Sequence, residues 1–227
     1  MSSASDLAAL AGLLADETRA AMCLALLDGR AWTAGELAGH AGVAPSTATE
    51  HLHRLVKGGL LTERKQGRHR YVQLADPAAA QLVEDLAARL EPETPRGGLR
   101  AVTASAALRR GRTCYDHLAG RLGVAVTDAM TAGKMLDQDG GFALTAYGKE
   151  WLVSTLGVSL EAGRRPLARA CLDWTERRHH LAGVAGARLC EAFLERRWVT
   201  RIGTGRAVRV TPDGTRALRS LLKTEVV

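Results

Sequence analysis

The chain has 227 residues and a formal net charge of +7, and hydrophobic residues make up 46% of it, a balance typical of a globular protein with room for two small domains. No apolar run approaches the roughly 20 residues that a membrane helix needs, and no basic segment precedes LAALAGLLA as it would in a signal peptide. We therefore expect a cytoplasmic protein whose four cysteines are reduced thiols, and the positive charge favours a polyanionic partner such as nucleic acid.

The N-terminal part predicts a series of helices joined by short breaks. Residues 5–28 predict one helix or two joined helices, with Asp16 as N-cap of the second. Thr33 and Glu36 form a T-x-x-E capping box at the start of a short helix. Pro45, after the glycines of GHAG, suits the first position of the next helix. Two short helices joined by a tight turn predict a helix-turn-helix.

The helix that begins at Pro45 has an apolar and a polar face. Its inward side chains are Ala48, Leu52, Leu55 and Val56. Small and hydrogen-bonding side chains at its outward N-terminal end would let the backbone approach a DNA major groove while reading base edges. The residues of this helix predicted to contact DNA are Ser46, Thr47, Thr49, Glu50, His53 and Arg54.

The next segment, LLTERKQGRHRYVQLA, predicts two short strands that turn at Gln66 and Gly67. A wing of this kind, next to a helix-turn-helix, favours contact with phosphates or a minor groove over a merely solvated charged hairpin. Its predicted DNA-binding residues are Arg64, Lys65, Arg68, His69 and Arg70.

Together, LADETRAAMCLALLDG and TAGELAGHAGVAPSTATEHLHRLVKGGLLTERKQGRHRYVQLA resemble the ArsR/SmtB type of winged-helix bacterial repressor over residues 5–90. The resemblance implies a homodimer that binds double-stranded DNA and releases it on sensing an inducer. Metal-sensing members carry a Cys-x-Cys pattern in the first helix of the helix-turn-helix. This chain has ELAGHAG there, so that metal site is missing.

A further amphipathic helix is expected in ADPAAAQLVEDLAARLEPE, capped by Asp76 and begun by Pro77. Its stripe of Leu82, Leu86 and Leu90 suits the dimer contact that the family resemblance implies. The proline- and glycine-containing stretch that follows predicts a linker over 91–99.

Residues 100–227 contain an internal duplication. The segment RTCYDHLAG begins at Arg112, and RACLDWTERRHHLAG, with the same Cys, Asp and His-Leu-Ala-Gly, begins at Arg169. Each copy ends in a strand-like stretch and a Thr-x-x-Gly helix start. We predict two helix–helix–helix–strand units packed about a pseudo-two-fold axis, because one unit is too short to bury a core alone. The predicted fold is thus mainly α with small β-wings.

Each copy also supplies a cysteine and a histidine. Cys114 and His117 are three residues apart, which would place them on one face of a helix. A thiolate and an imidazole there suit a soft divalent metal ion. Cys171 is eight or nine residues from His179 or His180, so these share a site only if the fold brings them together.

The candidate sensing residues are Cys114, His117, Cys171 and His180, with a soft metal ion or redox-active thiols as the chemistry, and the two cysteines are expected to meet across the repeat interface. In the alternative, the cysteines only fill the core and Asp116 and Asp173 pair with Arg112 and Arg169. A pocket for an organic ligand is a third alternative. Cys23 and Cys190 lie on apolar helix faces and are expected to pack.

No catalytic site is expected, because Cys114, Asp116 and His117 on one helical turn would not align with a substrate. Neither a phosphate-binding glycine loop nor H-E-x-x-H is found. The sequence predicts a DNA-binding domain at 5–90, a sensor or dimerisation domain at 100–227, and a sequence-specific transcriptional repressor released by an inducer. In the alternative, the second domain is a structural or protein-interaction module and no small-molecule inducer exists.

Overall fold

The computed structural model describes residues 3–67, 69–90, 99–161, 163, 165–203 and 205–224, with the backbone alone at 69 and 99–102. The chain divides into an N-terminal unit, Met1–Leu86, and a C-terminal unit, Ala87–Val227. The predicted linker lies outside the described residues except for position 99, where a helix begins. None of the helices in these ranges is both long enough and apolar enough to cross a lipid bilayer.

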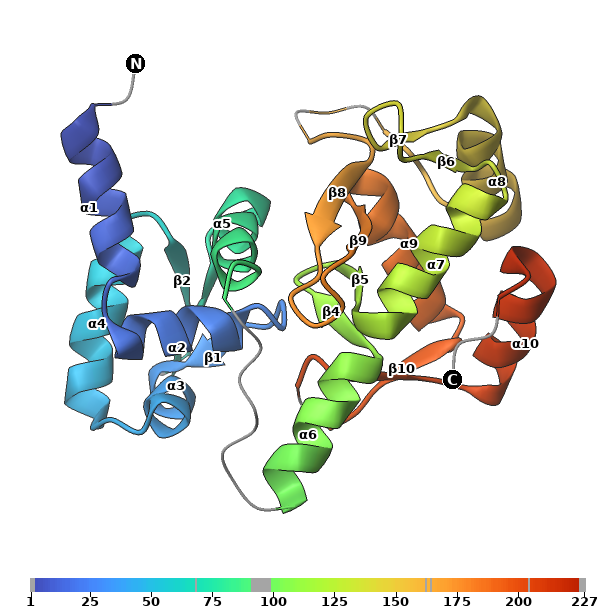
Figure 1. Cartoon of the computed structure of the whole chain (residues 1–227). Coiled ribbons are helices and arrows are strands. Elements are labelled where there is room, and N and C mark those ends of the chain that lie inside the picture. The colour runs from blue at the N-terminus through green and yellow to red at the C-terminus, as the bar shows by residue number, and fades with distance from the viewer. Residues whose placement is uncertain are drawn as a thin grey trace. The chain divides into compact units, whose positions relative to one another are not determined.

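The N-terminal unit has the predicted order of helices followed by a wing (Figure 1). Strands β1, β3 and β2 form one antiparallel sheet in that order, and Gln66 lies opposite His69 at the tip of the wing. The elements are α1 (Ala4–Leu14), α2 (Glu17–Leu26), β1 (Trp32–Thr33), α3 (Ala34–Ala41), α4 (Pro45–Lys57), β2 (Leu61–Gln66), β3 (His69–Leu74) and α5 (Pro77–Ala87).

Local hydrogen bonds explain where these helices begin. The Asp16 carboxylate accepts from the Arg19 backbone amide at 2.9 Å, which confirms the predicted cap. Thr33 and Glu36 form the predicted reciprocal capping box. Gly42 ends α3 with a φ of 69°, a conformation that glycine adopts without steric cost. The turn between α3 and α4 therefore follows directly from the sequence.

Arg19 joins three parts of this unit. Its guanidinium donates to the carbonyls of Leu13 and Gly12 at the end of α1, at 2.6 and 2.9 Å. Its third nitrogen lies 3.4 Å from Nδ1 of His51 in α4. The side chain thereby satisfies carbonyls that the end of a helix leaves without partners. Cys23, on the next turn of α2, is fully buried, and burial raises the pKa of its thiol to about 12, as expected of a packing residue.

The C-terminal unit begins with α6 (Leu99–Arg110) and continues as two repeats (Figure 1). Each repeat consists of a β-hairpin, a 13-residue helix, a second hairpin and an 11-residue helix. The first contains β4 (Arg112–Cys114), β5 (His117–Ala119), α7 (Gly120–Ala132), β6 (Leu136–Asp137), β7 (Ala143–Leu144) and α8 (Ala146–Leu156). The second contains β8 (Arg169–Leu172), β9 (His179–Ala182), α9 (Gly183–Glu195), β10 (Val199–Arg201), β11 (Val208–Val210) and α10 (Pro212–Leu222).

The duplication is therefore confirmed, but the predicted helix–helix–helix–strand unit is wrong. Cys114 and His117 do not lie on a helix, because Tyr115 and Asp116 turn the chain between two buried three-residue strands. Gly120 then takes a φ of 71°, and a Cβ there would lie 2.8 Å from the Arg109 carbonyl oxygen. This glycine permits the abrupt change from β5 to α7, and Gly183 does the same in the second repeat.

The two repeats exchange contacts in a symmetric way. Helix α7 packs on β9, and α9 packs on β5. A Cβ on Gly123 of α7 would lie 3.6 Å from that of His180, and a Cβ on Gly186 of α9 would lie 3.2 Å from that of His117. The hydroxyl of Thr127 accepts from the Leu181 amide at 2.8 Å. Apolar side chains of both repeats form one core, so each repeat completes the other.

Candidate functional site

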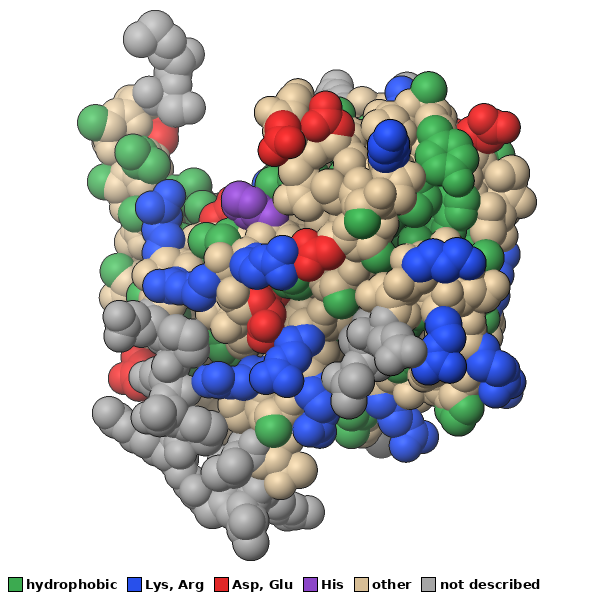
Figure 2. Space-filling model, turned by 45° about the vertical axis from the view of Figure 1, so that its right-hand side comes forward, with side chains coloured by type: hydrophobic (Ala, Val, Ile, Leu, Met, Phe, Trp, Pro, Cys, Tyr) green, Lys and Arg blue, Asp and Glu red, His purple; other side chains and the backbone are tan. Residues whose placement is uncertain are grey.

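The outward face of α4 matches its prediction. All six side chains predicted to contact DNA from this helix are exposed, and Ala48, Leu52 and Leu55 are buried beneath them. The face of the chain drawn in Figure 2 carries more Lys and Arg than Asp and Glu side chains, in keeping with the net charge of +7. The N-terminal unit thus presents a polar helix that is supported by an apolar core.

The wing and α4 share one surface. A hollow of about 380 Å³ is lined by Thr49, Glu50, His53, Arg54 and the wing residue Arg70. The structure therefore brings five of the predicted DNA-contact residues together.

Within the wing, Arg64 and Lys65 are exposed. The guanidinium of Arg70 lies 2.7 Å from the carboxylate of Glu63, so this cation is already paired within the wing. Arg68 and the side chain of His69 lie outside the described part of the chain.

A second constellation lies in the C-terminal unit. One ligand atom from each of Cys114, His117, Cys171 and His180 lies within 4.8 Å of the other three, and all four residues are buried; we call them the Cys–His cluster. The two Sγ atoms are 3.8 Å apart and the two Nε2 atoms 3.1 Å apart. The structure selects His180 over His179, which is exposed and lies edge-on to the ring of Phe142.

Strand register explains why the two Cys–His pairs occupy equivalent positions, although cysteine and histidine are separated by different numbers of residues in the two repeats. Cys114 lies directly opposite His117 across the β4–β5 hairpin, and Cys171 lies directly opposite His180 across β8–β9. Strands β5 and β9 are in contact (Figure 1). The two thiols and the two imidazole rings meet across this contact. The extra residues of the second copy lie beyond this pairing, where they add the Leu172–His179 strand pair and a longer loop, and they leave the Cys–His pairing intact.

A carboxylate lies behind each histidine, and an arginine lies behind each carboxylate. Nδ1 of His117 is 3.1 Å from Asp116, whose two oxygens accept from Arg165 at 2.5 and 3.0 Å. Nδ1 of His180 is 3.5 Å from Asp173, which lies 3.0 Å from Arg112. The pairings considered from the sequence, of Asp116 with Arg112 and of Asp173 with Arg169, are wrong, because Arg112 reaches across to the other repeat.

These charges shift several pKa values. Burial disfavours ionised Asp173, but Arg112 and a hydrogen bond from Thr175 outweigh this effect and lower its pKa to about 2. Burial likewise disfavours protonated His117, but hydrogen bonds with Asp116 and Cys171 raise its pKa to about 9.

The thiols of the C-terminal unit divide into two kinds. The hydrogen bond with Cys114, together with those from the two histidines, lowers the pKa of Cys171 well below its usual range. By contrast, burial among apolar groups raises the pKa of Cys190 to about 12, as expected of a packing residue. The Cys–His cluster therefore favours the thiolate, which is the form that binds soft metals and reacts with oxidants.

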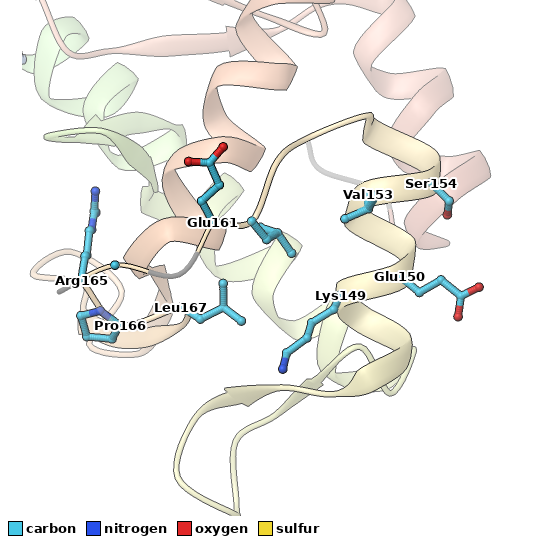
Figure 3. Close-up of a pocket in the computed structure, with 10 residues that line it drawn as sticks. Lys149, Glu150, Val153, Ser154, Glu161, Arg165, Pro166 and Leu167 are labelled. Carbon is cyan, nitrogen blue, oxygen red and sulfur yellow. The ribbon is translucent and has the colours of Figure 1, made fainter.

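The sequence did not identify a pocket of about 780 Å³ between α8 and the segment that precedes β8. Figure 3 shows Lys149 and Val153 of α8 on one side and Leu167 on the other. Arg165 also lines this pocket, and the same guanidinium holds Asp116 beside His117. A chain of contacts thus connects the pocket to the Cys–His cluster.

Known proteins resemble both parts of the chain. Residues 14–64 match the model of a helix-turn-helix domain. The chain is 39% identical over 225 residues to the uncharacterized HTH-type transcriptional regulator YdfF of Bacillus subtilis. This alignment covers 97% of this chain and 99% of that protein. It is 39% identical over 82 residues to the HTH-type transcriptional regulator CmtR of Mycobacterium tuberculosis, over 36% of this chain and 69% of that protein.

Among solved structures, one match is the homodimeric winged helix-turn-helix DNA-binding domain of a possible ArsR-family transcriptional regulator from Mycobacterium bovis. It is 26% identical and covers 36% of this chain and 75% of its own, with a TM-score of 0.34. The match to the Bacillus subtilis regulator, unlike this one, extends through both repeats of the C-terminal unit.

Proposed function

Because this chain belongs to the ArsR-type winged helix-turn-helix transcriptional regulators, which bind DNA and are not enzymes, we propose that it is a cytoplasmic, homodimeric repressor released from its operator by an inducer. In this proposal residues 5–90 bind DNA and form the dimer, 91–99 form a linker and 100–227 form the sensor. The observation that carries the proposal is the hollow shared by the polar face of α4 and the wing, within a chain that has a full-length regulator as its relative.

DNA recognition is assigned to α4 and the wing. Ser46, Thr47 and Thr49 are small and exposed at the start of α4, so they allow close approach to a major groove. Glu50, His53 and Arg54 would meet base edges or the adjacent backbone one to two turns later. The wing residues Arg64, Lys65, Arg68, His69 and Arg70 are proposed to meet phosphates or a minor groove.

The first helix supports the homodimer. Helix α1 has 11 residues and none of them is buried. A helix of that length is marginal in water unless an apolar face is packed. Leu7 is 68% exposed and Leu10 36%, while Leu86 of α5 is 46% exposed. A second copy of the chain would cover these leucines.

The Cys–His cluster is the proposed sensing site, through a metal ion or through oxidation of its thiols. The supporting observation is that two thiols and two imidazoles from both repeats converge in a buried position. An organic inducer is the second candidate, because Arg165 links the pocket beside α8 to Asp116 and His117. Zinc, arsenite and peroxide titrated against the operator complex, with Cys114→Ser/Cys171→Ser as comparison, distinguish these inducers.

DNA binding is tested on a duplex that the wild-type chain selects from a random library, with affinity measured by fluorescence anisotropy at several salt concentrations. Arg64→Ala should weaken selected and unselected duplexes alike and reduce the salt slope by about 1. Loss of a base contact in Thr47→Ala should cost about 1–3 kcal/mol on the selected duplex only. Arg216→Ala, which removes an exposed cation of α10, is the charge-matched control. Failure to enrich any duplex, or an unchanged salt slope in Arg64→Ala, would contradict the assignment.

A further inference from the structure

Two distances within the Cys–His cluster lie close to the edges of a metal tetrahedron, and its four ligand atoms all lie within 4.8 Å of one another. In a regular tetrahedron two ligand atoms are about 1.63 bond lengths apart, so zinc–sulfur bonds of about 2.3 Å require about 3.8 Å between sulfurs, and zinc–nitrogen bonds of about 2.0–2.1 Å require about 3.3–3.4 Å between nitrogens. The Sγ atoms of Cys114 and Cys171 are 3.8 Å apart. The Nε2 atoms of His117 and His180 are 3.1 Å apart. Small side-chain movements would therefore seat all four atoms on one ion.

Charge balance also favours a divalent ion. The four residues are at most 3% exposed, so an uncompensated charge among them would be costly. Two thiolates neutralise an ion of charge +2, and two neutral imidazoles complete the set without adding charge. Any protons that the two thiols and the two imidazoles still hold leave to solvent when the ion binds.

The groups behind the ligands fit the same arrangement. Metal-bound histidines commonly donate their second ring nitrogen to a carboxylate, which fixes the tautomer and orients the ring. Here Asp116 lies at Nδ1 of His117 and Asp173 lies at Nδ1 of His180, which leaves both Nε2 atoms facing inward. Nδ1 of His180 is buried without a hydrogen bond, so turning this ring toward Asp173 would satisfy that atom as well.

A disulfide fits the site less well. Its two sulfurs would have to approach from 3.8 Å to about 2.05 Å. A disulfide would also leave the facing imidazoles and their two carboxylates without a role.

We infer that the Cys–His cluster is a closed tetrahedral site for one zinc-class divalent ion, and that the ion fastens the two repeats to each other. Each repeat supplies one thiolate and one imidazole, so neither can hold the ion alone. Four protein ligands leave no open position for a substrate, which is the arrangement of a structural or regulatory site. This inference rests on the proposed function only because it places the ion at the cluster proposed there as the sensing site. It adds the identity of the bound species, a zinc-class ion.

The test uses the full chain, reduced and stripped with a chelator, and then titrated with Co²⁺ followed by Zn²⁺. We expect saturation at one Co²⁺ per chain, with the strong visible bands of tetrahedral cobalt and a thiolate-to-cobalt charge-transfer band. Zn²⁺ should displace Co²⁺ and raise the unfolding temperature of the chain, because the ion binds the folded state. Native mass spectrometry should show the same single ion.

Variants locate the ion. Cys171→Ser should lose about half of the charge-transfer intensity, because one of two thiolates remains. Cys190→Ser is the matched control, since it alters a buried thiol of the same unit outside the cluster, and it should keep the full spectrum. Circular dichroism checks that each variant is folded. If Cys171→Ser does not fold, the cobalt titration of the wild-type chain still tests the inference.

Three results would overturn the inference: no Co²⁺ retained by the wild-type chain, the weak spectrum of six-coordinate cobalt, or equal losses in Cys171→Ser and Cys190→Ser. Ready formation of a Cys114–Cys171 disulfide in a chain that retains no ion would assign the cluster to redox chemistry instead. A chain that binds duplex DNA but no ion refutes this inference alone. A chain that binds the ion but no duplex refutes the proposed function alone.

Discussion

Replacement of Asp173 by alanine should strongly destabilise the C-terminal unit. The side chains of Asp173 and Arg112 are both 0% exposed and their charged atoms are 3.0 Å apart. In Asp173→Ala the guanidinium stays buried without its counter-charge, a change that typically costs about 3–5 kcal/mol. The amide of Gly120, which donates to this carboxylate at 2.6 Å, also loses its acceptor. Since a domain is stable by only about 5–15 kcal/mol, the loss should be readily measured.

The assay is urea unfolding at neutral pH with chelator present, so that no bound ion contributes. Tryptophan fluorescence reports on the unit, because Trp174 lies 4.6 Å from the Arg112 guanidinium. Asp128→Ala is the control: its partner is Arg178, the pair is 59% and 40% exposed, and exposed pairs contribute about 0–1 kcal/mol.

A second variant separates charge from packing. In Asp173→Ala combined with Arg112→Leu no buried charge is left unpaired, so much of the lost stability should return. The reasoning is refuted if Asp173→Ala costs no more than Asp128→Ala, or if the double variant is less stable than Asp173→Ala.

Three further predictions concern other parts of the chain. Asp16→Ala should lower the free energy of unfolding by about 1 kcal/mol, because it removes a helix cap. The hydrogen bond from the Arg19 amide lowers the pKa of Asp16 below 3.8, so the cap stabilises the fold above that pH and is lost as the pH falls through the lowered value. Chemical unfolding measured as a function of pH would reveal this dependence. Gly186→Ala should cost at least about 1–3 kcal/mol in the same urea assay, because its Cβ would lie 2.3 Å from the Leu181 carbonyl oxygen. Leu86→Glu should shift the chain from dimer to monomer in sedimentation, and an unchanged dimer would exclude this face from the interface.

The sequence predicted the N-terminal unit well because its signals are local. The Asp16 cap, the Thr33–Glu36 box and Pro45 each act within one helical turn, so the helix starts can be derived without tertiary contacts. The apolar pattern of α4 is likewise long enough to show a helical period.

The C-terminal unit was predicted only in part, because the first hairpin of each repeat, β4–β5 and β8–β9, has strands of only three or four residues. Strands this short show no period, and the spacing of Cys114 and His117 was therefore assigned to a helix. The four residues of the Cys–His cluster were still identified, because a cysteine and a histidine recur at matching places in both copies of the repeated sequence. The reach of Arg112 across to Asp173 depends on how the repeats pack, and no local pattern contains that information.

The two ends of the Cys–His cluster differ in their access to solvent. Behind His180, Asp173 and Arg112 are fully enclosed, whereas behind His117 the side chains of Asp116 and Arg165 are 28% and 31% exposed. A site shared by two identical chains about a two-fold axis would be alike at both ends. Because both halves here belong to one chain, the two ends can differ: the buried Asp173–Arg112 pair can hold its end rigid, while the partly exposed Asp116–Arg165 pair can admit solutes to the cluster. Exchange with small solutes should therefore be one-sided, with Arg165 controlling its rate.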